Sequence, residues 1–334
     1  MPNLVRETSD RPRLRRAFAA ALTLTVACAA AFAFAADYPV KPVRVVVPFA
    51  PGGSSDSAAR MIGSKLGEVW GQQVLIDNRP GGSTTIGAGF VSRAAADGYT
   101  LLLANANHVV NPALMKSLPY DPARDFAPIV RLAEQSVALL VHPSVPARTV
   151  KEFISLAKSR PGQLNFASPG VGTASHMTGL LFQSMSRIDM VFVPDKGAGP
   201  SLVDLMAGQV TVGASGLTSS LPYIDSGKLR ALGVATAKRS VFRPDIPTIA
   251  ESGVPGFQVT NWFGVLAPAG TPEPLIEGIH QQVVKIAAQE PNRQLMLKMG
   301  LEPALMGPAE FGAFIRSEIQ KWIKVGREMG LQTQ

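Results

Sequence analysis

Polar and apolar residues alternate in blocks along the chain, and the blocks have the lengths of strands and helices. Short, mostly apolar runs are typical of strands buried on both faces of a parallel sheet, and the clearest ones lie at 43–47, 99–104 and 137–141. The segment 56–70 instead repeats apolar residues at helical spacing, with Met61, Ile62 and Leu66 on one face. The pattern therefore predicts an α/β protein.

The same alternation continues along the chain. Further strands are expected at 74–76, 164–167, 190–193, 210–214 and 229–235, and further helices after 149 and at 86–96, 173–186, 200–207, 222–226 and 309–326. Their order predicts two doubly wound units. In such units, the loops at the carboxyl ends of parallel strands form the ligand site. We therefore expect a ligand cleft between the two units.

Two loops carry the same candidate chemistry. The first reads PFAPGGSSD over 48–56 and the second reads FASPGVGTASH over 166–176; each leads from a strand through a turn to the start of a helix. Backbone N–H groups at a helix start lack partners within the helix, and the helix dipole adds positive charge there, so such ends bind carboxylate or phosphate. One such loop is equally typical of a plain helix cap. Two of them, one in each unit, favour an anion site.

Signatures of enzymes and metal sites are missing from the sequence. It contains no phosphate-binding GxxxxGK[ST], no GxGxxG and no GxSxG nucleophile elbow. The four histidines, His108, His142, His176 and His280, are too far apart to form a metal-binding pair. A hydrolase acting through a loop serine is the alternative, but no base for it is evident. We expect a binding protein with no metal and no cofactor.

The N-terminus has the composition of a secretory signal peptide. Arg residues precede an uncharged stretch over 17–36, and Ala33-Phe34-Ala35 forms a cleavage pattern. We expect residues 1–35 to be removed and the exported chain to begin at Ala36. A membrane anchor and, because of Cys28, a lipoprotein are the alternatives. The sequence RRAF over 15–18 leaves the Sec and twin-arginine routes open.

Composition and charge limit the possible partners. The 334 residues suit two domains, and 46% apolar with 17% charged residues suits a folded α/β protein. Residues 1–36 hold five Arg and two acidic residues, so 27 basic and 22 acidic residues remain after them, a net charge of +5. The basic residues are scattered and aromatic residues are sparse, which argues against a nucleic-acid binder.

Several motifs together resemble one family. In order, they include VVPFAPGGSSDSAAR, IDNRPGG, NPALMKSLPYDPARDFAPI, GVGTASHM, PDIPTIAESGVPGF and WFGVLAPAGTP. They resemble the periplasmic solute-binding proteins of tripartite tricarboxylate transporters, also called Bug proteins, over the whole chain that follows the signal. The resemblance implies a periplasmic receptor that binds a small organic carboxylate and delivers it to membrane transporter subunits.

The resemblance also implies a type II periplasmic binding protein fold, in which two α/β lobes close on a ligand. We expect residues 37–135 with 262–334 to form lobe 1 and residues 136–261 to form lobe 2. The crossing strands are expected near 131–136 and 258–262. A receptor that presents both lobes to a membrane partner is expected to be a monomer.

Ligand contacts are implied in both loops. The positions carried over are Phe49, Ala50, Gly53, Ser54 and Asp56 in the first loop and Gly172, Thr173, Ala174 and His176 in the second. Asp56 is expected to cap the helix and to orient the loop or a water molecule. His176 either steadies the second loop, which we favour, or contacts the ligand.

Side chains at the far end of the cleft are expected to set specificity: Asn105, Asn107, His108, Asp195, Lys196, Ser215 and Leu217. Asp195 stands where relatives usually have Tyr, and Ser215 where many have Asp. A carboxylate at Asp195 would repel a second acid group on the ligand, or would pair with an ammonium group, unless Lys196 neutralises it. We predict an organic acid with one anchored carboxylate. The alternatives are another anionic solute and a sensing role in a signalling system.

Overall fold

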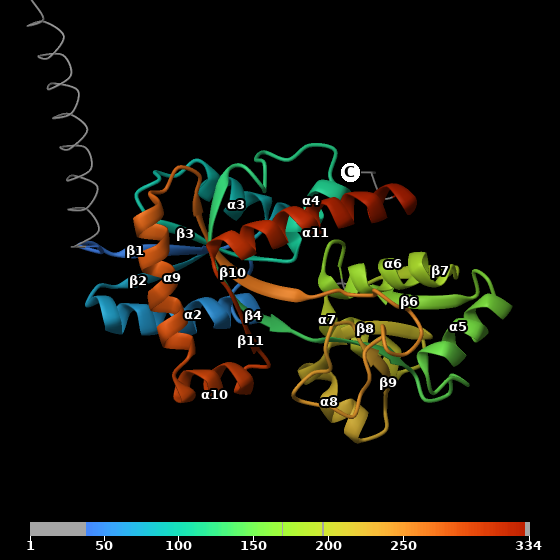
Figure 1. Ribbon diagram of the computed structural model, residues 1–334. Coiled ribbons are helices and arrows are strands. Elements are labelled where there is room, and N and C mark those ends of the chain that lie inside the picture. Colours follow the sequence, from blue (N-terminus) through green and yellow to red (C-terminus); the bar gives the residue numbers. More distant parts are fainter. Residues whose placement is uncertain (1–37, 169, 196, 331–334) are drawn as a thin grey trace, which may run out of the picture.

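The computed structural model describes residues 38–168, 170–195 and 197–330. In this part of the chain, two sheets form the centres of two lobes, and helices flank each sheet (Figure 1). Lobe 1 contains chain from both before and after lobe 2, so the chain crosses between the lobes twice. The predicted α/β architecture with two lobes is confirmed.

Lobe 1 has a six-stranded sheet in the order β11-β4-β10-β3-β1-β2. Its strands are β1 (Val43–Val47), β2 (Val74–Asn78), β3 (Thr100–Asn105), β4 (Phe126–Gln135), β10 (Asn261–Pro268) and β11 (Glu302–Met306). β1 is parallel to both of its neighbours, β2 and β3. β10 is antiparallel to β3 and β4, and β11 is antiparallel to β4.

Lobe 2 has a five-stranded sheet in the order β7-β6-β8-β5-β9. Its strands are β5 (Val137–Val141), β6 (Leu164–Ser168), β7 (Met190–Pro194), β8 (Val212–Gly216) and β9 (Arg230–Val234). β6 is parallel to β7 and β8, whereas β5 is antiparallel to β8 and β9.

The expectation of parallel sheets is therefore wrong for part of each lobe. β10 starts beside the end of β3, where Phe263 pairs with Asn105, and β5 starts beside the end of β8, where Val137 pairs with Gly216. Both strands follow a crossing between the lobes. They enter at the edge where the parallel strands end, so they run in the opposite direction.

Helices cover both sheets. Lobe 1 carries α2 (Ser54–Trp70), the short 3-10 helix η1 (Gly82–Thr84), α3 (Thr85–Ser92), α4 (Asn107–Leu114), α9 (Glu273–Ala287), α10 (Glu290–Lys298) and α11 (Pro308–Glu328); lobe 2 carries α5 (Val150–Ser159), α6 (Ala174–Ser186), α7 (Ala198–Met206) and α8 (Leu217–Asp225). The helix expected at 173–186 begins one residue later, because Thr173 is its cap. No helix is predicted where α4 lies, because this segment contains Pro112 and two Asn residues.

Hydrogen bonds join the two crossings. The side-chain amide of Asn261 donates to Oε1 of Gln135 at 3.1 Å. Glu302 of β11 accepts a 2.7 Å hydrogen bond from Ser136 Oγ, at the crossing, and another of 2.7 Å from Ser240 Oγ in lobe 2. Its second carboxylate oxygen accepts from the Val241 N–H at 3.2 Å. Glu302 therefore ties lobe 1 to lobe 2 at the hinge.

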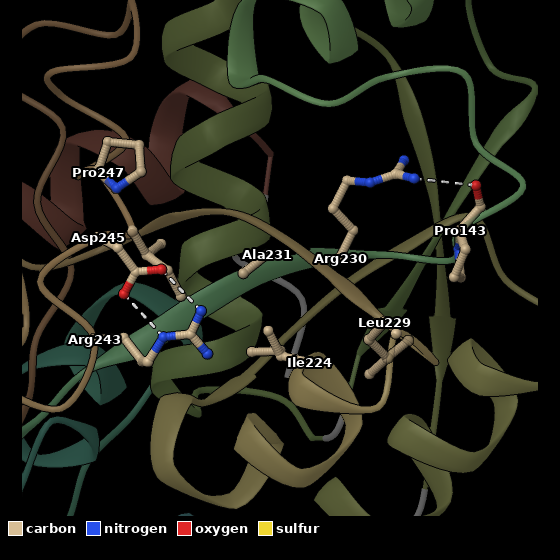
Figure 2. A pocket seen from close by; sticks show the side chains of 10 residues that line it. Pro143, Ile224, Leu229, Arg230, Ala231, Arg243, Asp245 and Pro247 are labelled. Carbon is tan, nitrogen blue, oxygen red and sulfur yellow. Dashed lines mark hydrogen bonds and ion pairs between the residues drawn. The ribbon is translucent and has the colours of Figure 1, made fainter.

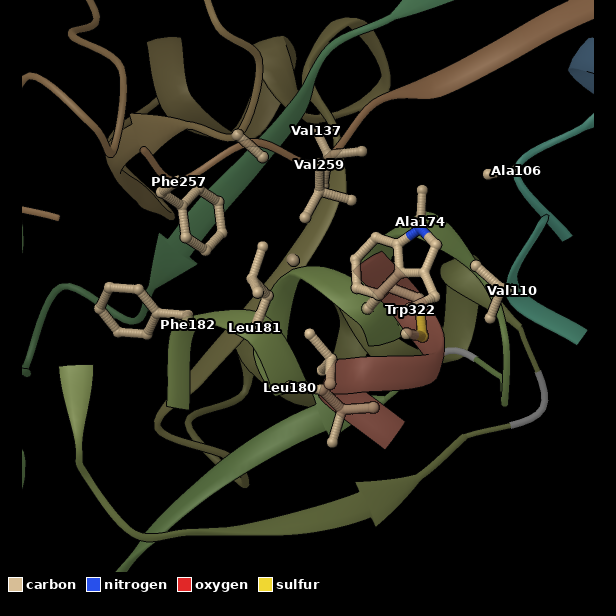
Figure 3. Close-up of a cluster of buried hydrophobic side chains, with 14 of the residues drawn as sticks. Ala106, Val110, Val137, Ala174, Leu180, Leu181, Phe182, Phe257, Val259 and Trp322 are labelled. Atoms are coloured by element: carbon tan, nitrogen blue, oxygen red, sulfur yellow. The ribbon is translucent and has the colours of Figure 1, made fainter. Parts of the chain in front are cut away.

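A buried apolar cluster also continues from one lobe into the other. It contains Trp322 of α11 and Val110 of α4 in lobe 1, together with Ala174 and Leu180 of α6 in lobe 2. Figure 3 shows the indole ring of Trp322 beside Ala174 and Val110. The lobes therefore bury hydrophobic surface against each other in this arrangement.

Candidate functional site

The first predicted loop links β1 to α2. Gly52 has a φ of 93°, which favours glycine, and Gly53 caps the helix without a side-chain hydrogen bond. The first helical hydrogen bond runs from the Ser57 N–H to the Gly53 carbonyl at 2.9 Å. The N–H groups of the helical residues before Ser57 therefore face out of the helix end, as an anion site requires.

Asp56 fixes the shape of this loop. Its buried carboxylate accepts hydrogen bonds from the Gly52 N–H at 3.0 Å, from Arg60 Nε at 2.9 Å and from Asn78 Nδ2 at 3.0 Å. The Arg60 hydrogen bond contributes most to lowering the pKa of Asp56 to about 2. An ionised Asp56 therefore orients the loop, as expected, but the expectation that it caps α2 is wrong, because Gly53 is the N-cap and Asp56 lies in the first turn of the helix.

Asn78 is a supporting residue that the sequence analysis missed. It ends β2 and pairs in register with Val47, the last residue of β1. Its Nδ2 donates to the Phe49 carbonyl at 3.1 Å as well as to Asp56. Its position at the end of a strand next to β1 is the signal that would have identified it. The side chain of Phe49 packs against the core of lobe 1.

The second predicted loop links β6 to α6 and is held by its own side chains. Thr173 caps α6: its Oγ1 accepts from the His176 N–H at 3.2 Å and donates to the Gly170 carbonyl at 2.8 Å. The Gly172 N–H donates to Nδ1 of His176 at 3.3 Å. Burial lowers the pKa of His176 to about 4, so the ring is neutral at pH 7. These contacts match the favoured interpretation that His176 steadies the loop.

The structure brings the second loop against lobe 1. A methyl group built on Gly172 would lie 3.2 Å from Nδ2 of Asn107, 3.2 Å from Cδ1 of Leu114 and 3.6 Å from Oγ of Ser83. A methyl group built on Gly87, at the start of α3, would lie 2.9 Å from Cβ of Pro48 in the first loop. The segment 83–87 therefore lies between the two predicted loops.

Two of the predicted far-end residues have partners within lobe 1. Oδ1 of Asn105 accepts from the Asn107 N–H at 3.1 Å, which supports the start of α4. The His108 ring is buried between Tyr120 and Phe126, and its Nε2 lies 2.9 Å from the Pro122 carbonyl. Burial also lowers the pKa of His108 to about 4. A neutral histidine packed in this way is a core residue of lobe 1.

Asp195 directly follows β7, and Ser215 lies near the end of β8. Both residues are therefore at the edge where the parallel strands of lobe 2 end. Oδ2 of Asp195 and Oγ of Ser215 are buried and have no hydrogen-bond partner in the described part of the chain. Burial raises the pKa of Asp195, with Ser201 and Asp204 of α7 as neighbours. Lys196 lies outside the described residues.

A hollow of about 350 Å³ lies elsewhere, at the far edge of the lobe 2 sheet (Figure 2). Its two guanidinium groups are already engaged. Arg243 pairs with Asp245 at 2.8 Å and with Asp225 at 2.7 Å. Arg230 donates to the carbonyls of Val145 and Ala147. With both cations engaged, this hollow is a poor receptor for a carboxylate.

Metal sites and membrane-spanning helices can be assessed for residues 38–168, 170–195 and 197–330. No group of three or more His, Cys, Asp or Glu side chains there is placed to hold a metal ion. No helix within these ranges is long and apolar enough to span a bilayer.

Comparison with known proteins identifies the family. The profile of the tripartite tricarboxylate transporter family receptor matches residues 58–331. BugT of Bordetella pertussis is 35% identical over 298 residues, which cover 89% of this chain and 91% of BugT.

Solved structures agree with this match. The structure of R. palustris Rpa4515 with adipate is 36% identical, with a TM-score of 0.76 and coverage of 88% of this chain and 99% of that one. MatC (Rpa3494) from Rhodopseudomonas palustris with bound malate is 35% identical, with a TM-score of 0.72 and coverage of 86% and 100%. The chain belongs to the tripartite tricarboxylate transporter family of receptors.

Proposed function

We propose that this protein is a periplasmic receptor that captures a small organic carboxylate between the N-termini of α2 and α6 and delivers it to a tripartite tricarboxylate-type transporter. One observation carries the proposal: two helix starts, one from each lobe, follow parallel strands and border the same interlobe region. Unpaired N–H groups and helix dipoles at such ends stabilise a carboxylate. The related structures with adipate and malate support the same ligand class.

The proposed contacts come from both loops. In the first loop, Ala50, Gly53 and Ser54 are proposed to contact the ligand, next to Phe49 and Asp56. In the second loop, Gly172, Thr173 and Ala174 are proposed to contact it, next to His176. Asp195 and Ser215 are proposed for the far end of the cleft. Asn105 is also proposed for the far end of the cleft, since only its Oδ1 is engaged within the chain, whereas His108 is proposed as support for lobe 1, because its ring is buried and Nε2 lies against the Pro122 carbonyl.

The proposal also covers processing and domain organisation. Residues 1–35 are proposed to be removed on export to the periplasm. Residues 37–135 with 262–334 and residues 136–261 are proposed as the two lobes of a monomer that binds its ligand without converting it. A receptor for another anionic solute, or one that reports to a signalling system, is the second candidate.

Thermal unfolding of the protein purified from the periplasm, stripped of bound ligand, tests the function. Mono-, di- and tricarboxylates, amino acids, phosphate and sulfonates are added at millimolar concentration. A ligand at a thousand times its Kd is expected to stabilise the folded state by about 4 kcal/mol. Stabilisation by phosphate or sulfonate alone would favour the second candidate, and chemical conversion of the ligand would contradict a receptor.

Asp195 gives a prediction about ligand choice. Its buried, unpartnered carboxylate oxygen disfavours a second acid group nearby. We expect Asp195→Asn to strengthen binding of dicarboxylates about tenfold relative to monocarboxylates of the same length, as measured by isothermal titration calorimetry. Asp189→Asn, at an exposed position before β7, is the control. An unchanged ratio in Asp195→Asn would remove Asp195 from the site.

A further inference from the structure

A strained turn in lobe 1 lies next to the second loop, which belongs to lobe 2. Ser83 has φ 50° and ψ 47°, and Thr84 has φ 79°. Residues other than glycine rarely adopt this left-handed conformation, and a β-branched residue such as threonine does so least easily. Backbone strain of this kind is often found at functional sites, where surrounding structure has to maintain it. Other residues must therefore stabilise this turn, and its neighbours indicate its role.

Asn111 of α4 holds the turn. It is fully buried, and its Nδ2 donates to the Ser83 carbonyl at 2.8 Å and to Thr84 Oγ1 at 3.3 Å. Asn107 lies one helical turn earlier, on the same face of α4. Its Nδ2 donates to Ser83 Oγ at 3.4 Å. Two asparagines on one helix face therefore position a turn that its own residues disfavour.

The second loop lies against this turn from the other lobe. The position of a methyl group on Gly172 is 3.2 Å from Asn107 Nδ2 and 3.6 Å from Ser83 Oγ, so only a residue without a side chain fits there comfortably. The φ of Gly172 is 81°, and its N–H is held by His176. The loop that would hold the ligand in lobe 2 thus lies beside Ser83 and Asn107, too close for a side chain at position 172.

The Ser83 hydroxyl has hydrogen-bonding capacity left. Its contacts with Asn107 Nδ2 and with Asn111 Oδ1 are both 3.4 Å, longer than the usual 2.7–3.0 Å. A hydroxyl has one donor and two acceptor positions. It can therefore exchange these weak contacts for a stronger one with the second loop or with a ligand.

We propose that the turn Ser83–Thr84, held by Asn111, is the seat on which the second loop docks, and that Ser83 and Asn107 are positioning residues that set how completely the cleft closes on a carboxylate. This inference rests on the proposed receptor function. The apparent Kd equals the intrinsic Kd divided by the fraction of closed, binding-competent protein. Side chains that favour closure therefore tighten binding even where they do not touch the ligand.

Variants of Ser83 and Asn107 test the inference in the complete exported protein, residues 36–334. Ser83→Ala and Asn107→Ala are compared with Ser92→Ala, whose hydroxyl donates to Gly89 at the other end of α3. Calorimetric titration uses adipate, malate and the carboxylate that gives the largest thermal shift. We expect the first two variants to weaken binding at least fivefold and Ser92→Ala to remain within twofold of the wild type.

A distance measurement provides a readout that does not depend on affinity. Spin labels are attached at Ser64→Cys on α2 and Val203→Cys on α7, two exposed positions in different lobes. Double electron–electron resonance then measures the distance between the lobes with and without ligand. We expect Ser83→Ala and Asn107→Ala to lower the population of the short interlobe distance, while Ser92→Ala leaves it unchanged.

The outcomes separate the inference from the proposed function. If the wild type binds a carboxylate and the Ser83 and Asn107 variants bind and close equally well, the docking seat is wrong and the receptor function stands. If the wild type binds no carboxylate, the proposed function fails. In that case the ligand-free distances still decide the inference: a short-distance population that is absent, or that does not change in the variants, overturns it.

Discussion

Asp56 is the residue on which the first loop depends most. It connects Gly52, Arg60 and Asn78, so its loss would leave the Gly52 N–H and the Asn78 amide with one partner fewer. We predict that Asp56→Asn lowers the free energy of unfolding by about 1–3 kcal/mol and weakens carboxylate binding. Urea unfolding and calorimetric titration measure the two effects.

Glu68→Gln is the matched control, because Glu68 lies on the same helix in an exposed pair with Lys65. It should change the free energy of unfolding by less than about 0.5 kcal/mol. Equal effects of the two variants would mean that the hydrogen bonds of Asp56 contribute no more to stability than an exposed ion pair does.

His176 makes stability depend on pH. Burial lowers its pKa from 6.5 to about 4, so the unfolded chain takes up a proton before the folded chain does as the pH falls. The stability given by the neutral ring is complete above pH 6.5 and is lost between pH 6.5 and 4, a change of roughly 3 kcal/mol. Burial lowers the pKa of His108 from 6.5 to about 4 as well, so its contribution to stability is lost over the same pH range.

Unfolding free energies at pH 7 and pH 4 test this reasoning. We expect the loss in His176→Asn to be about half that of the wild type, since His108 still contributes. The amide oxygen of Asn retains an acceptor for Gly172. His142→Asn, which changes a partly exposed ring bonded to Ser144, should show the full loss. A full loss in His176→Asn as well would contradict the assigned role.

At the scale of elements, two helix caps with the same geometry differ in their expected effect on binding. Thr173 caps α6 and Thr149 caps α5, and each accepts an N–H hydrogen bond at 3.2 Å. Replacing either residue by Ala should cost about 1 kcal/mol of stability. Only Thr173→Ala should also weaken carboxylate binding. α5 follows β5, which ends beside Val212 at the start of β8, opposite the edge where the parallel strands end.

Thermal unfolding with and without the best carboxylate ligand distinguishes the two cap variants. A loss of ligand stabilisation in both, or in neither, would argue against the N-terminus of α6 as a ligand contact. Such a result would leave the structural role of each cap intact.

The elements that the sequence predicts well are those with a local cause. β1 and β5 have the predicted bounds, because each is a mostly apolar run ended by proline or a turn. The two site loops were also predictable, since a strand, a Gly-rich turn and a helix start follow directly in sequence. Helix α4 was not, because Pro112 and its asparagines are typical of a loop.

The supporting residues depend on contacts that sequence spacing does not reveal. Asn78 reaches Asp56 because β2 pairs with β1, and Asn111 reaches Ser83 because α4 folds back onto the turn before α3. His108 follows polar residues in the sequence, yet α4 buries its ring in the core of lobe 1. The direction of β5 and β10 likewise depends on where the chain enters each sheet.

At the scale of the whole molecule, Glu302 couples the lobes at the hinge. Its carboxylate accepts from Ser136, Ser240 and Val241, which lie at the crossing and in lobe 2. Glu302→Ala would leave these donors without that acceptor. We predict a loss of about 1–3 kcal/mol and a broader unfolding transition in scanning calorimetry, since the lobes would unfold less cooperatively.

Glu290→Ala is the control for Glu302, because Glu290 makes only exposed contacts on α10 in the same lobe. It should leave both the unfolding free energy and the width of the transition unchanged. A sharp, unshifted transition in Glu302→Ala would show that Glu302 is not needed to couple the lobes.

The central claim is that one carboxylate is held by two helix starts from different lobes. The most direct test is to follow the backbone amide signals by NMR while adding the carboxylate found in the thermal screen. We predict that the amide protons at the starts of α2 and α6 shift downfield together, with a single Kd, while those of α5 do not move. Shifts in only one of the two helices, or around the hollow lined by Arg230 and Arg243, would contradict the account.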